Sequence, residues 1–539
     1  MIQIAQQPPE KASPKVPGWA WVLVLLLGLV LRGQGYARSV WIDELYTSNL
    51  FCGQPVVLLK TLYSDIHPPA YFVFIHFWNR LFGDGEVWLR LPALLSGLAA
   101  ILLAGRMAQR HLGPAAGLAT ALWLATSPVH IWYSQEARPY STNLFLALAA
   151  FATYEAWEAA PQRKRRGLLF LLCLLGTVFS HYYTAVLPIL FAGMAVVRRA
   201  PHRRGVLLAC GSVLGLLAMY MGAKMGFSHV PTEKGYLRGF DLGEAWKLGF
   251  QWFLTGNSLT PVGAPAVWGG RLLIVVQVLG VLVFLRGVKR LMGVGAWHLL
   301  AGLVALPTFL WLLNAIGLDK TYIERSALPV LPLFAMVIGA GMTGWRSPSA
   351  GRTAGALAGA SVLVVLAAFV TRGDRWTVYK PNPDWRGVSE WIGQPWLSTP
   401  VDLYSDYVSP TALSYYDDRF QETKNFERNE AKIAGLLETS AKLFGTEGFP
   451  GAWVQTQCRA QIAAYDAHMD ALEAGMLVRI HELARVSVPE LMPGEHAWLL
   501  VYMQPSARAL EVLADPHLKV LQAQHFRSLT LYQLIRADE

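Results

Sequence analysis

The chain has 539 residues, of which 54% are hydrophobic and only 15% are charged. Soluble domains carry about a quarter charged residues, so this composition excludes an ordinary soluble enzyme and indicates that lipid surrounds much of the chain. The four cysteines are too few for a disulfide scaffold and lack the paired spacing of a zinc or redox site. The net charge is +10. In a membrane protein the positions of the basic residues are more informative than their number, because they indicate the orientation of the membrane spans.

Apolar runs long enough to cross a bilayer recur from Pro17 to Val370. We expect about eleven membrane spans, at residues 17–31, 87–106, 113–131, 142–160, 167–180, 184–198, 205–223, 267–286, 296–317, 327–345 and 353–371. Lys and Arg cluster at every second gap, which predicts a cytoplasmic N-terminus and, with an odd number of spans, an extracytoplasmic C-terminus. A cleaved signal peptide is the alternative for the first span, but no convincing cleavage site precedes Tyr36, and Arg32 can snorkel to the outer interface.

The composition changes after Thr371, where charged residues return to an ordinary density. We expect a transmembrane domain at residues 1–371, with a first outside loop at about 32–86, and a C-terminal extracytoplasmic α/β domain at 372–539. Short runs of apolar or alternating apolar and polar residues predict strands at 401–405, 497–503 and 529–535. Two longer stretches predict helices at 429–443 and 459–486. No phosphate-binding glycine loop supports nucleotide binding in this domain.

Acids, bases and aromatic residues gather in the loops of the outer face. The first loop contains Trp41-Ile42-Asp43-Glu44 and His67-Pro68-Pro69, and later loops contain Ser134-Gln135-Glu136-Ala137-Arg138-Pro139-Tyr140, His181-Tyr182-Tyr183 and Asp319-Lys320-Thr321-Tyr322-Ile323-Glu324-Arg325. Separate loops that supply such side chains to one plane indicate a site more strongly than a single motif does. We therefore expect surface chemistry at the extracytoplasmic interface.

Asp43 and Glu44 are either helix-terminal charges in solvent or part of a catalytic pair. A carboxylate at the membrane surface can accept the proton of an attacking hydroxyl. Neighbouring residues on a helix point about 100° apart, so one acid faces the acceptor while the other binds donor or orients the loop. We choose Asp43 as the base.

Arg138 and Arg325 are candidates for holding a lipid phosphate, since a guanidinium binds phosphate bidentately. Lys320 and Tyr140 are further candidates for the donor phosphate. For these residues the alternatives are a surface ion pair between Glu136 and Arg138, and snorkelling of Arg325.

His67, Glu136, His181 and Tyr182 are candidates for substrate or metal binding. No HxxxH or HExxH spacing supports zinc, so substrate hydrogen bonding or a satisfied interfacial histidine is favoured over a metal role. No cofactor is assigned, and a divalent cation (Mg²⁺, Mn²⁺ or Zn²⁺) is left open. Cys52 and Cys458 would lie on the oxidising side and could pair, although two free thiols are the simpler expectation.

Six segments together resemble bacterial membrane glycosyltransferases of the C-type superfamily, particularly the protein O-mannosyltransferase and aminoarabinose-transferase group. The segments are WIDELYTSNL, HPPAYFVFIHFWNRLFGDGEVWLRLPALLSG, SPVHIWYSQEARPYS, SHYYTAVLPI, ERSALPVLPLFAMVIGAG and DWRGVSEWI. The resemblance covers roughly residues 17–390 and implies a polytopic α-helical membrane protein with the C-type glycosyltransferase fold. One departure is Ser326-Ala327, which stands where the family more usually has an aromatic–leucine pair.

The resemblance implies transfer of a sugar from a polyprenyl-phosphate donor on the extracytoplasmic face of the bacterial inner membrane. Asp43 and Glu44 match the acidic pair of loop one, and His67 starts the family's HPP element. The second-loop and later elements are matched by Glu136, Arg138, Tyr140, His181, Tyr182 and Arg325. The implied enzyme is an inverting hexosyl- or pentosyltransferase whose acceptor is a protein, lipid or glycan, with no nucleic-acid partner.

Three other functions are weighed against this one. A transporter or flippase of a lipid-linked sugar also suits about eleven spans, but carriers place ionisable groups near the bilayer midplane rather than at one face. A noncatalytic lipid-binding scaffold would make Asp43 dispensable. An O-antigen-ligase-type transferase would carry its long outer loop late in the chain, whereas the acids here come early.

Overall fold

The protein is described by a computed structural model that folds into two compact units. The described residues are 16–45, 47–48, 67–83, 85–227, 239–256, 266–317, 322–344, 383–392, 401–405, 413, 420–422, 438, 456, 478–482, 496–502, 505–526 and 529–536. The first unit takes its residues from Met1–Tyr36, Tyr63–Phe74 and Arg90–Tyr379. The second unit takes its residues from Ala37–Leu62, Ile75–Leu89 and Lys380–Glu539, so parts of the expected first loop group with the C-terminal residues.

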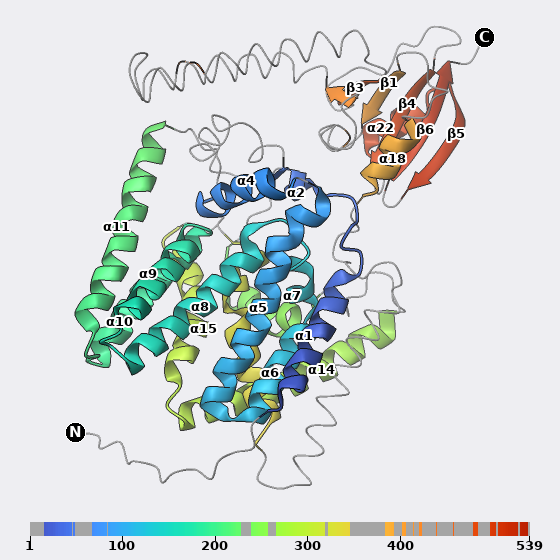
Figure 1. The fold of residues 1–539 in the computed structure, drawn as a ribbon. Coiled ribbons are helices and arrows are strands. Elements are labelled where there is room, and N and C mark those ends of the chain that lie inside the picture. Colours follow the sequence, from blue (N-terminus) through green and yellow to red (C-terminus); the bar gives the residue numbers. More distant parts are fainter. Residues whose placement is uncertain are drawn as a thin grey trace. The chain divides into compact units, whose positions relative to one another are not determined.

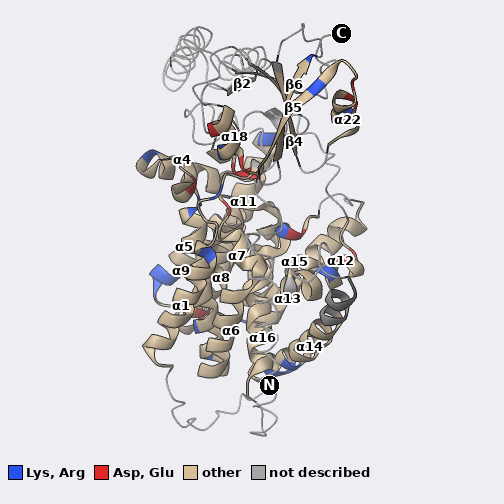
Figure 2. Cartoon of the chain, turned by 90° about the vertical axis from the view of Figure 1, so that its right-hand side faces the viewer, with Lys and Arg blue, Asp and Glu red and all other residues tan. Residues whose placement is uncertain are grey.

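The first unit is a bundle of helices (Figure 1). Its elements are α1 (Gly18–Gly33), α5 (Glu86–Leu112, shared with the second unit), α6 (Pro114–Thr126), α7 (Pro128–Tyr133), α8 (Pro139–Ala159), α9 (Lys164–Val178), η2 (Tyr182–Ala185), α10 (Val186–Val197), α11 (Arg203–Phe227), α12 (Leu242–Trp246), the π-helical η3 (Lys247–Trp252), α13 (Phe253–Thr255), α14 (Ala266–Gly293), α15 (Trp297–Ala315), η4 (Glu324–Val330) and α16 (Leu331–Met342). Charged residues are sparse along these helices (Figure 2). Many large apolar side chains are exposed on them, as expected where lipid replaces water.

Four of the described helices are long and apolar enough to cross a membrane, at Glu86–Leu112, Arg203–Lys224, Trp297–Ala315 and Glu324–Met342. Shorter apolar helices cover Gly18–Gly33, Pro114–Thr126 and Tyr182–Val197. The chain is thus a multi-pass membrane protein, but the expected number of eleven spans is not confirmed. The last expected span, at 353–371, lies outside the described residues.

One expected span, at 113–131, is interrupted. Gly113 has φ 89°, in the left-handed region that favours glycine, and it turns α5 into α6 with Pro114 at the first helical position. Ser127 then separates α6 from α7, because its side chain accepts a 3.4 Å hydrogen bond from the His130 amide and Pro128 starts the next helix. The hydrophobic run alone did not reveal this capped break.

Helix α16 lies in the core of the bundle, with every residue from Leu331 to Gly341 buried. It packs against α6 and α14. A Cβ on Gly339 would come within 2.1 Å of Thr120 Oγ1, so glycine is required for this close approach. Arg290 Nη1 donates to the carbonyl oxygens of Ala340 at 2.7 Å and Thr343 at 2.8 Å, which satisfies the end of the helix.

The second unit contains a six-stranded mixed sheet in the order β2-β3-β1-β4-β6-β5. The strands are β1 (Val401–Ser405), β2 (Phe420–Glu422), β3 (Val478–Glu482), β4 (His496–Tyr502), β5 (Leu518–Phe526) and β6 (Leu529–Arg536); the described helices are α2 (Ile42–Leu45), α18 (Trp385–Ile392) and α22 (Ala507–Leu513), and α4 (Ala70–Phe82) has residues in both units. Strands β2, β3, β1 and β4 pair in parallel, and β6 and β5 complete the sheet antiparallel.

The three strands expected at 401–405, 497–503 and 529–535 are confirmed within one or two residues at their ends. The helix expected at 459–486 is wrong over Val478–Glu482, which forms β3. Val478 and Ile480 alternate with polar residues and pair with both β1 and β2, so sheet pairing overrides the helical pattern there. The remainder of that range, most of the helix expected at 429–443, Cys52 and Cys458 lie outside the described residues.

Candidate functional site

Arg138 and His67 meet in the first unit. The Nη2 atom of Arg138 lies 3.1 Å from Nε2 of His67. Because a guanidinium only donates, His67 Nε2 is the acceptor and the imidazole is neutral. The Arg138 guanidinium also lies over the ring of Phe72, 5.7 Å from its centroid, and is 95% buried with the rest of the side chain. Nε2 of His67 is therefore held by Arg138.

The segment before Arg138 is held by buried hydrogen bonds to α1. Gln135 Nε2 donates to the carbonyl oxygens of Arg32 at 2.7 Å and Gln34 at 2.6 Å. Arg32 itself is fully buried, where it donates to the carbonyl of Ala125 at 3.0 Å and to Nδ1 of His130 at 2.6 Å. The expectation that Arg32 snorkels outward is therefore wrong. The guanidinium instead ties α1 to α6 and α7, and so supports the turn that presents Arg138 as the N-cap residue of α8.

Arg325 and His181 approach the same cluster through Tyr140. The Arg325 guanidinium lies 5.6 Å from the centroid of the Tyr140 ring, and that ring lies 6.4 Å from the His181 ring. Burial, the neighbouring His67 and the positive charges of Arg325 and Arg138 lower the pKa of His181 to about 3. His181 is thus neutral at physiological pH and supplies hydrogen-bonding capacity rather than charge.

Lys224 adds a third cation that the sequence analysis did not identify. Its Nζ donates a 3.3 Å hydrogen bond to the Tyr182 hydroxyl and lies 5.5 Å from the centroid of that ring. The side chain is almost fully buried. The available signal was its position directly after the apolar run at 205–223, since a buried lysine at the end of a span is a functional candidate.

Glu136 and Tyr133 provide the acidic and aromatic side of the cluster. Glu136 is buried and its Oε2 accepts a 3.1 Å hydrogen bond from Trp132 Nε1. Burial is the largest cause that raises the pKa of Tyr133 well above its usual value, and the negative charge of Glu136 raises it further. The positive charge of Arg325 lowers this pKa but does not outweigh the other two effects. Tyr133 therefore stays a neutral hydrogen-bond donor. Its ring packs edge-on against Tyr140 at 5.2 Å.

Asp43 and Glu44 lie in the second unit, in the first turn of α2. Glu44 is 1% exposed, and its Oε2 accepts a 2.8 Å hydrogen bond from the backbone amide of Trp41. A glutamate at the third helical position that bonds back to the residue before the helix is one half of a capping box. Asp43 is only partly buried. The two acids thus differ in environment: Glu44 shapes the turn, and Asp43 is the more accessible of the two.

The α2 turn is joined to the C-terminal residues of its unit. Val40 and Leu45 are buried in one apolar core with Trp385, Val388 and Trp498. This packing gives α2 a rigid support although the helix has a single turn.

Polar contacts also hold the residues just before the α2 turn. The Ser39 hydroxyl donates to Asp384 Oδ1 at 3.2 Å and accepts from the backbone amide of Arg386 at 3.3 Å. Arg386 is also ion-paired with Glu86. The DWRG segment that follows the membrane region therefore positions the residues on either side of Trp41.

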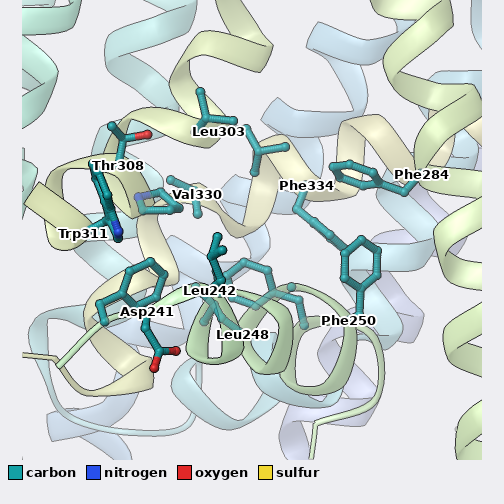
Figure 3. A pocket seen from close by; sticks show the side chains of 16 residues that line it. Asp241, Leu242, Leu248, Phe250, Phe284, Leu303, Thr308, Trp311, Val330 and Phe334 are labelled. Atoms are coloured by element: carbon teal, nitrogen blue, oxygen red, sulfur yellow. The ribbon is translucent and has the colours of Figure 1, made fainter. Parts of the chain in front are cut away.

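An apolar cavity of about 390 Å³ opens beside η4 in the first unit. Trp311 and Thr308 of α15 face Leu242 and Leu248 across it, and aromatic side chains close its far end, as Figure 3 shows. Val330 lines the cavity and belongs to η4, the same short helix that carries Arg325. Aromatic contacts from Tyr133 to Trp252 at 6.0 Å and from Trp252 to Phe253 at 5.7 Å join the cavity wall to the cationic cluster.

The structure therefore brings together a defined subset of the expected site residues. His67, Arg138, Tyr140, His181 and Arg325 form one cluster, with Glu136 and Tyr182 at its edges. Asp43 and Glu44 belong to the other unit, and Lys320 lies outside the described residues. Lys224 was not identified from the sequence, and no role was assigned to Tyr133 or to the Asp384–Arg386 segment, because these roles depend on contacts between residues far apart in the chain.

Comparisons with known proteins agree with this architecture. Residues 66–222 match the sequence model of the family described as dolichyl-phosphate-mannose-protein mannosyltransferase. The structure of ArnT from Cupriavidus metallidurans bound to undecaprenyl phosphate aligns with a TM-score of 0.52 at 15% identity, over 96% of this chain and 98% of that chain. The apo state of the same protein aligns with a TM-score of 0.53 at 14% identity, over the same shares of both chains. No protein of curated function is significantly similar in sequence.

The family match and the structural alignment together identify the chain as a membrane protein with the C-type glycosyltransferase fold, resembling the protein O-mannosyltransferase and aminoarabinose-transferase group.

Proposed function

We propose that the chain is an inverting glycosyltransferase that transfers a sugar from a polyprenyl-phosphate donor to a hydroxyl group of a protein, lipid or glycan acceptor. The observation that carries the proposal is the cationic cluster of the buried Arg138 and the half-buried Arg325, set in a fold shared with a protein crystallised with undecaprenyl phosphate. Guanidinium groups suit a phosphate that is charged both before and during the reaction.

Arg138 and Arg325 hold the donor phosphate in this proposal, and Lys224 adds positive charge at the edge of the cluster. His181 is neutral, so it donates or accepts a hydrogen bond without adding to the charge that the phosphate meets. When the bond between the anomeric carbon and the phosphate oxygen breaks, the negative charge grows on that oxygen. Fixed cations then stabilise the leaving group, which needs no proton from a general acid.

Asp43 serves as the general base. It takes the proton of the acceptor hydroxyl while the hydroxyl oxygen attacks the anomeric carbon and polyprenyl phosphate departs as an anion. One displacement of this kind inverts the configuration at the anomeric carbon. Glu44 keeps the α2 turn in place through its bond to the Trp41 amide, and is a positioning residue rather than a catalytic one.

The polyprenyl chain occupies the apolar cavity beside η4. Its lining is dominated by Phe, Leu, Val and Trp side chains, with Asp241 and Thr308 as polar exceptions. An apolar cavity of this kind next to a cationic cluster matches a ligand that has a long hydrocarbon tail and a phosphate head.

The proposal is tested by transfer from a radiolabelled polyprenyl-phosphate sugar in liposomes that contain the purified protein. We expect the label to move to an acceptor in a membrane extract and polyprenyl phosphate to accumulate in equal amount. A strain that lacks the protein should accumulate the unused lipid-linked sugar, which identifies the sugar. Movement of intact donor across the liposome membrane, without bond cleavage, would instead assign the chain to the flippases.

We further propose that the N-terminus is cytoplasmic and the C-terminal residues are extracytoplasmic, in the inner membrane of a bacterium. The support is the recurrence of basic residues at alternate gaps, including Arg163–Arg166. Alkaline phosphatase fused at Gly393 should be active and the same reporter fused at Arg163 should be inactive. The reverse pattern would place the cationic cluster on the cytoplasmic side and contradict the proposed reaction.

A further inference from the structure

Three side chains of the kinds that bind metal ions, each from a different helix, meet at a place apart from the site described above. His111 is the last residue but one of α5, Glu155 lies near the end of α8, and His298 lies near the start of α15. The Nε2 atoms of both histidines point at a single carboxylate oxygen: Glu155 Oε1 is 2.9 Å from His111 and 2.8 Å from His298. All three ligand atoms lie within 4.8 Å of one another, and no other such group of three exists in the described part of the chain.

The cluster is largely buried, with one partly exposed side at His111, and retains unused ligand capacity. The side chains of Glu155 and His298 are 10% and 4% exposed, and that of His111 is 20% exposed. The second carboxylate oxygen, Glu155 Oε2, is buried and accepts no hydrogen bond; it forms a 3.5 Å ion pair with Nη1 of the mostly exposed Arg110. A buried carboxylate oxygen without a hydrogen bond is costly, and a cation bound between the three side chains would satisfy it.

The cluster is distinct from the glycosyl-transfer site. Arg138 precedes the first residue of α8, whereas Glu155 lies sixteen residues further along that helix than Pro139. At 1.5 Å per residue the two positions are separated by about 24 Å along the helix axis. The bundle therefore carries its phosphate-binding candidates at one end of α8 and this group near the other end.

We propose that His111, Glu155 and His298 bind a Zn²⁺ ion that fastens α5, α8 and α15 together. Two imidazole nitrogens and one carboxylate are a ligand set that zinc accepts, and the partly exposed side of His111 leaves room for water as a fourth ligand. In a tetrahedral site with bonds of about 2.0–2.1 Å the ligand atoms are about 3.3 Å apart. The two histidine–glutamate distances of 2.8–2.9 Å therefore need a small outward shift, and the two histidine nitrogens already lie within 4.8 Å of each other.

The alternative is a cluster held by hydrogen bonds alone, with both histidines donating to Glu155 Oε1. The two cases differ in what a glutamine substitution does. His298→Gln can still donate a hydrogen bond to Glu155, but it removes a strong zinc ligand. If the cluster binds zinc, His298→Gln therefore loses the metal; if the cluster is held by hydrogen bonds alone, the same variant keeps its packing and there is no metal to lose.

The test measures zinc by elemental mass spectrometry in the full chain, purified in detergent with an affinity tag that contains no histidine. We expect about one tightly held zinc ion per chain in the wild type, and a fall of about fivefold or more in His298→Gln and in His111→Gln. Cobalt supplied in place of zinc should give the visible absorption of a four-coordinate site in the wild type but not in His298→Gln or His111→Gln. Each variant is checked for an unchanged elution volume in size exclusion.

His202→Gln is the matched control. His202 is another buried histidine of the first unit, packed against Trp157 with ring centroids 4.8 Å apart, and it takes no part in the cluster. We expect this variant to keep its zinc. Zinc content below about one ion per five chains in zinc-supplied wild type, or equal zinc in His298→Gln and His202→Gln, would overturn the proposal. Because the readout is metal content, neither result depends on whether the chain transfers a sugar.

Discussion

Asp43→Asn is expected to lower the rate of sugar transfer by about 10² or more while donor binding persists. The amide keeps the size and much of the hydrogen bonding of the carboxylate but cannot accept the proton of the acceptor hydroxyl. Asp43 is the partly exposed acid of the α2 turn, and its neighbours Val40 and Leu45 are buried in the core of the second unit. The measurement is the turnover of radiolabelled donor in liposomes, with donor binding determined separately.

Two controls separate the base from its surroundings. Glu44→Gln removes the neighbouring negative charge but can still bond to the Trp41 amide, since glutamine also completes a capping box, so most of the activity should remain. Glu390→Gln removes an exposed acid from α18 of the same unit and should leave the rate unchanged. If Asp43→Asn turns over at a near-normal rate, Asp43 is not the base, and Glu44 and Glu136 become the acids to test.

Arg138→Ala should reduce both donor affinity and the rate of transfer. Hydrogen bonds to a charged group contribute about 1.5–3 kcal/mol, which corresponds to a loss of about ten- to hundredfold in donor binding. The phosphate is charged in the bound donor and in the transition state, so the loss is expected in both. Binding of a radiolabelled polyprenyl phosphate to the purified protein, measured beside turnover, distinguishes this variant from Asp43→Asn.

Arg198→Ala is the matched control for the loss of a buried or half-buried arginine. Arg198 pairs with Glu158 at 2.8 Å near the far end of α8 and lies over Trp297, away from the cluster around Arg138. Its removal should leave donor affinity at the wild-type value. Arg138→Lys should fall between the wild type and the alanine variant, because lysine keeps the charge but not the planar pair of donors. Normal donor binding by Arg138→Ala would remove that residue from the phosphate site.

Much of the helical unit could be predicted from the sequence because lipid imposes a simple rule on composition. A run of apolar residues must become a helix in a bilayer, since every backbone polar group has to be bonded within the segment. The ranges 87–106 and 296–317 accordingly became α5 and α15. A short continuous apolar run likewise predicted β4, which is buried on both faces, and partial alternation predicted β6, because a strand with one buried face has a period of two.

The candidate site could be predicted residue by residue but not as a geometry. Arg138, Arg325 and His181 were expected from their loops, yet the meeting of Arg325 and His181 at Tyr140, and of Arg138 with His67, rests on packing between segments that are distant in sequence. The sequence-based expectation for Arg32 was wrong, because the general tendency of basic residues at the end of a span to snorkel placed its guanidinium at the membrane interface. The carbonyl oxygens and His130 that bury it come from α6 and α7, and no pattern within α1 indicates them.

The sequence by itself determined that much of the chain forms apolar helices, and which polar residues are available for chemistry. Those properties depend on short-range composition and on the balance between water and hydrocarbon. The tertiary structure alone decided that Glu44 caps a turn supported by Trp385 and Trp498, and that Glu155 meets histidines 44 and 143 residues away. Such pairings depend on the close packing of side chains from several elements, and local periodicity contains no information about which of them will meet.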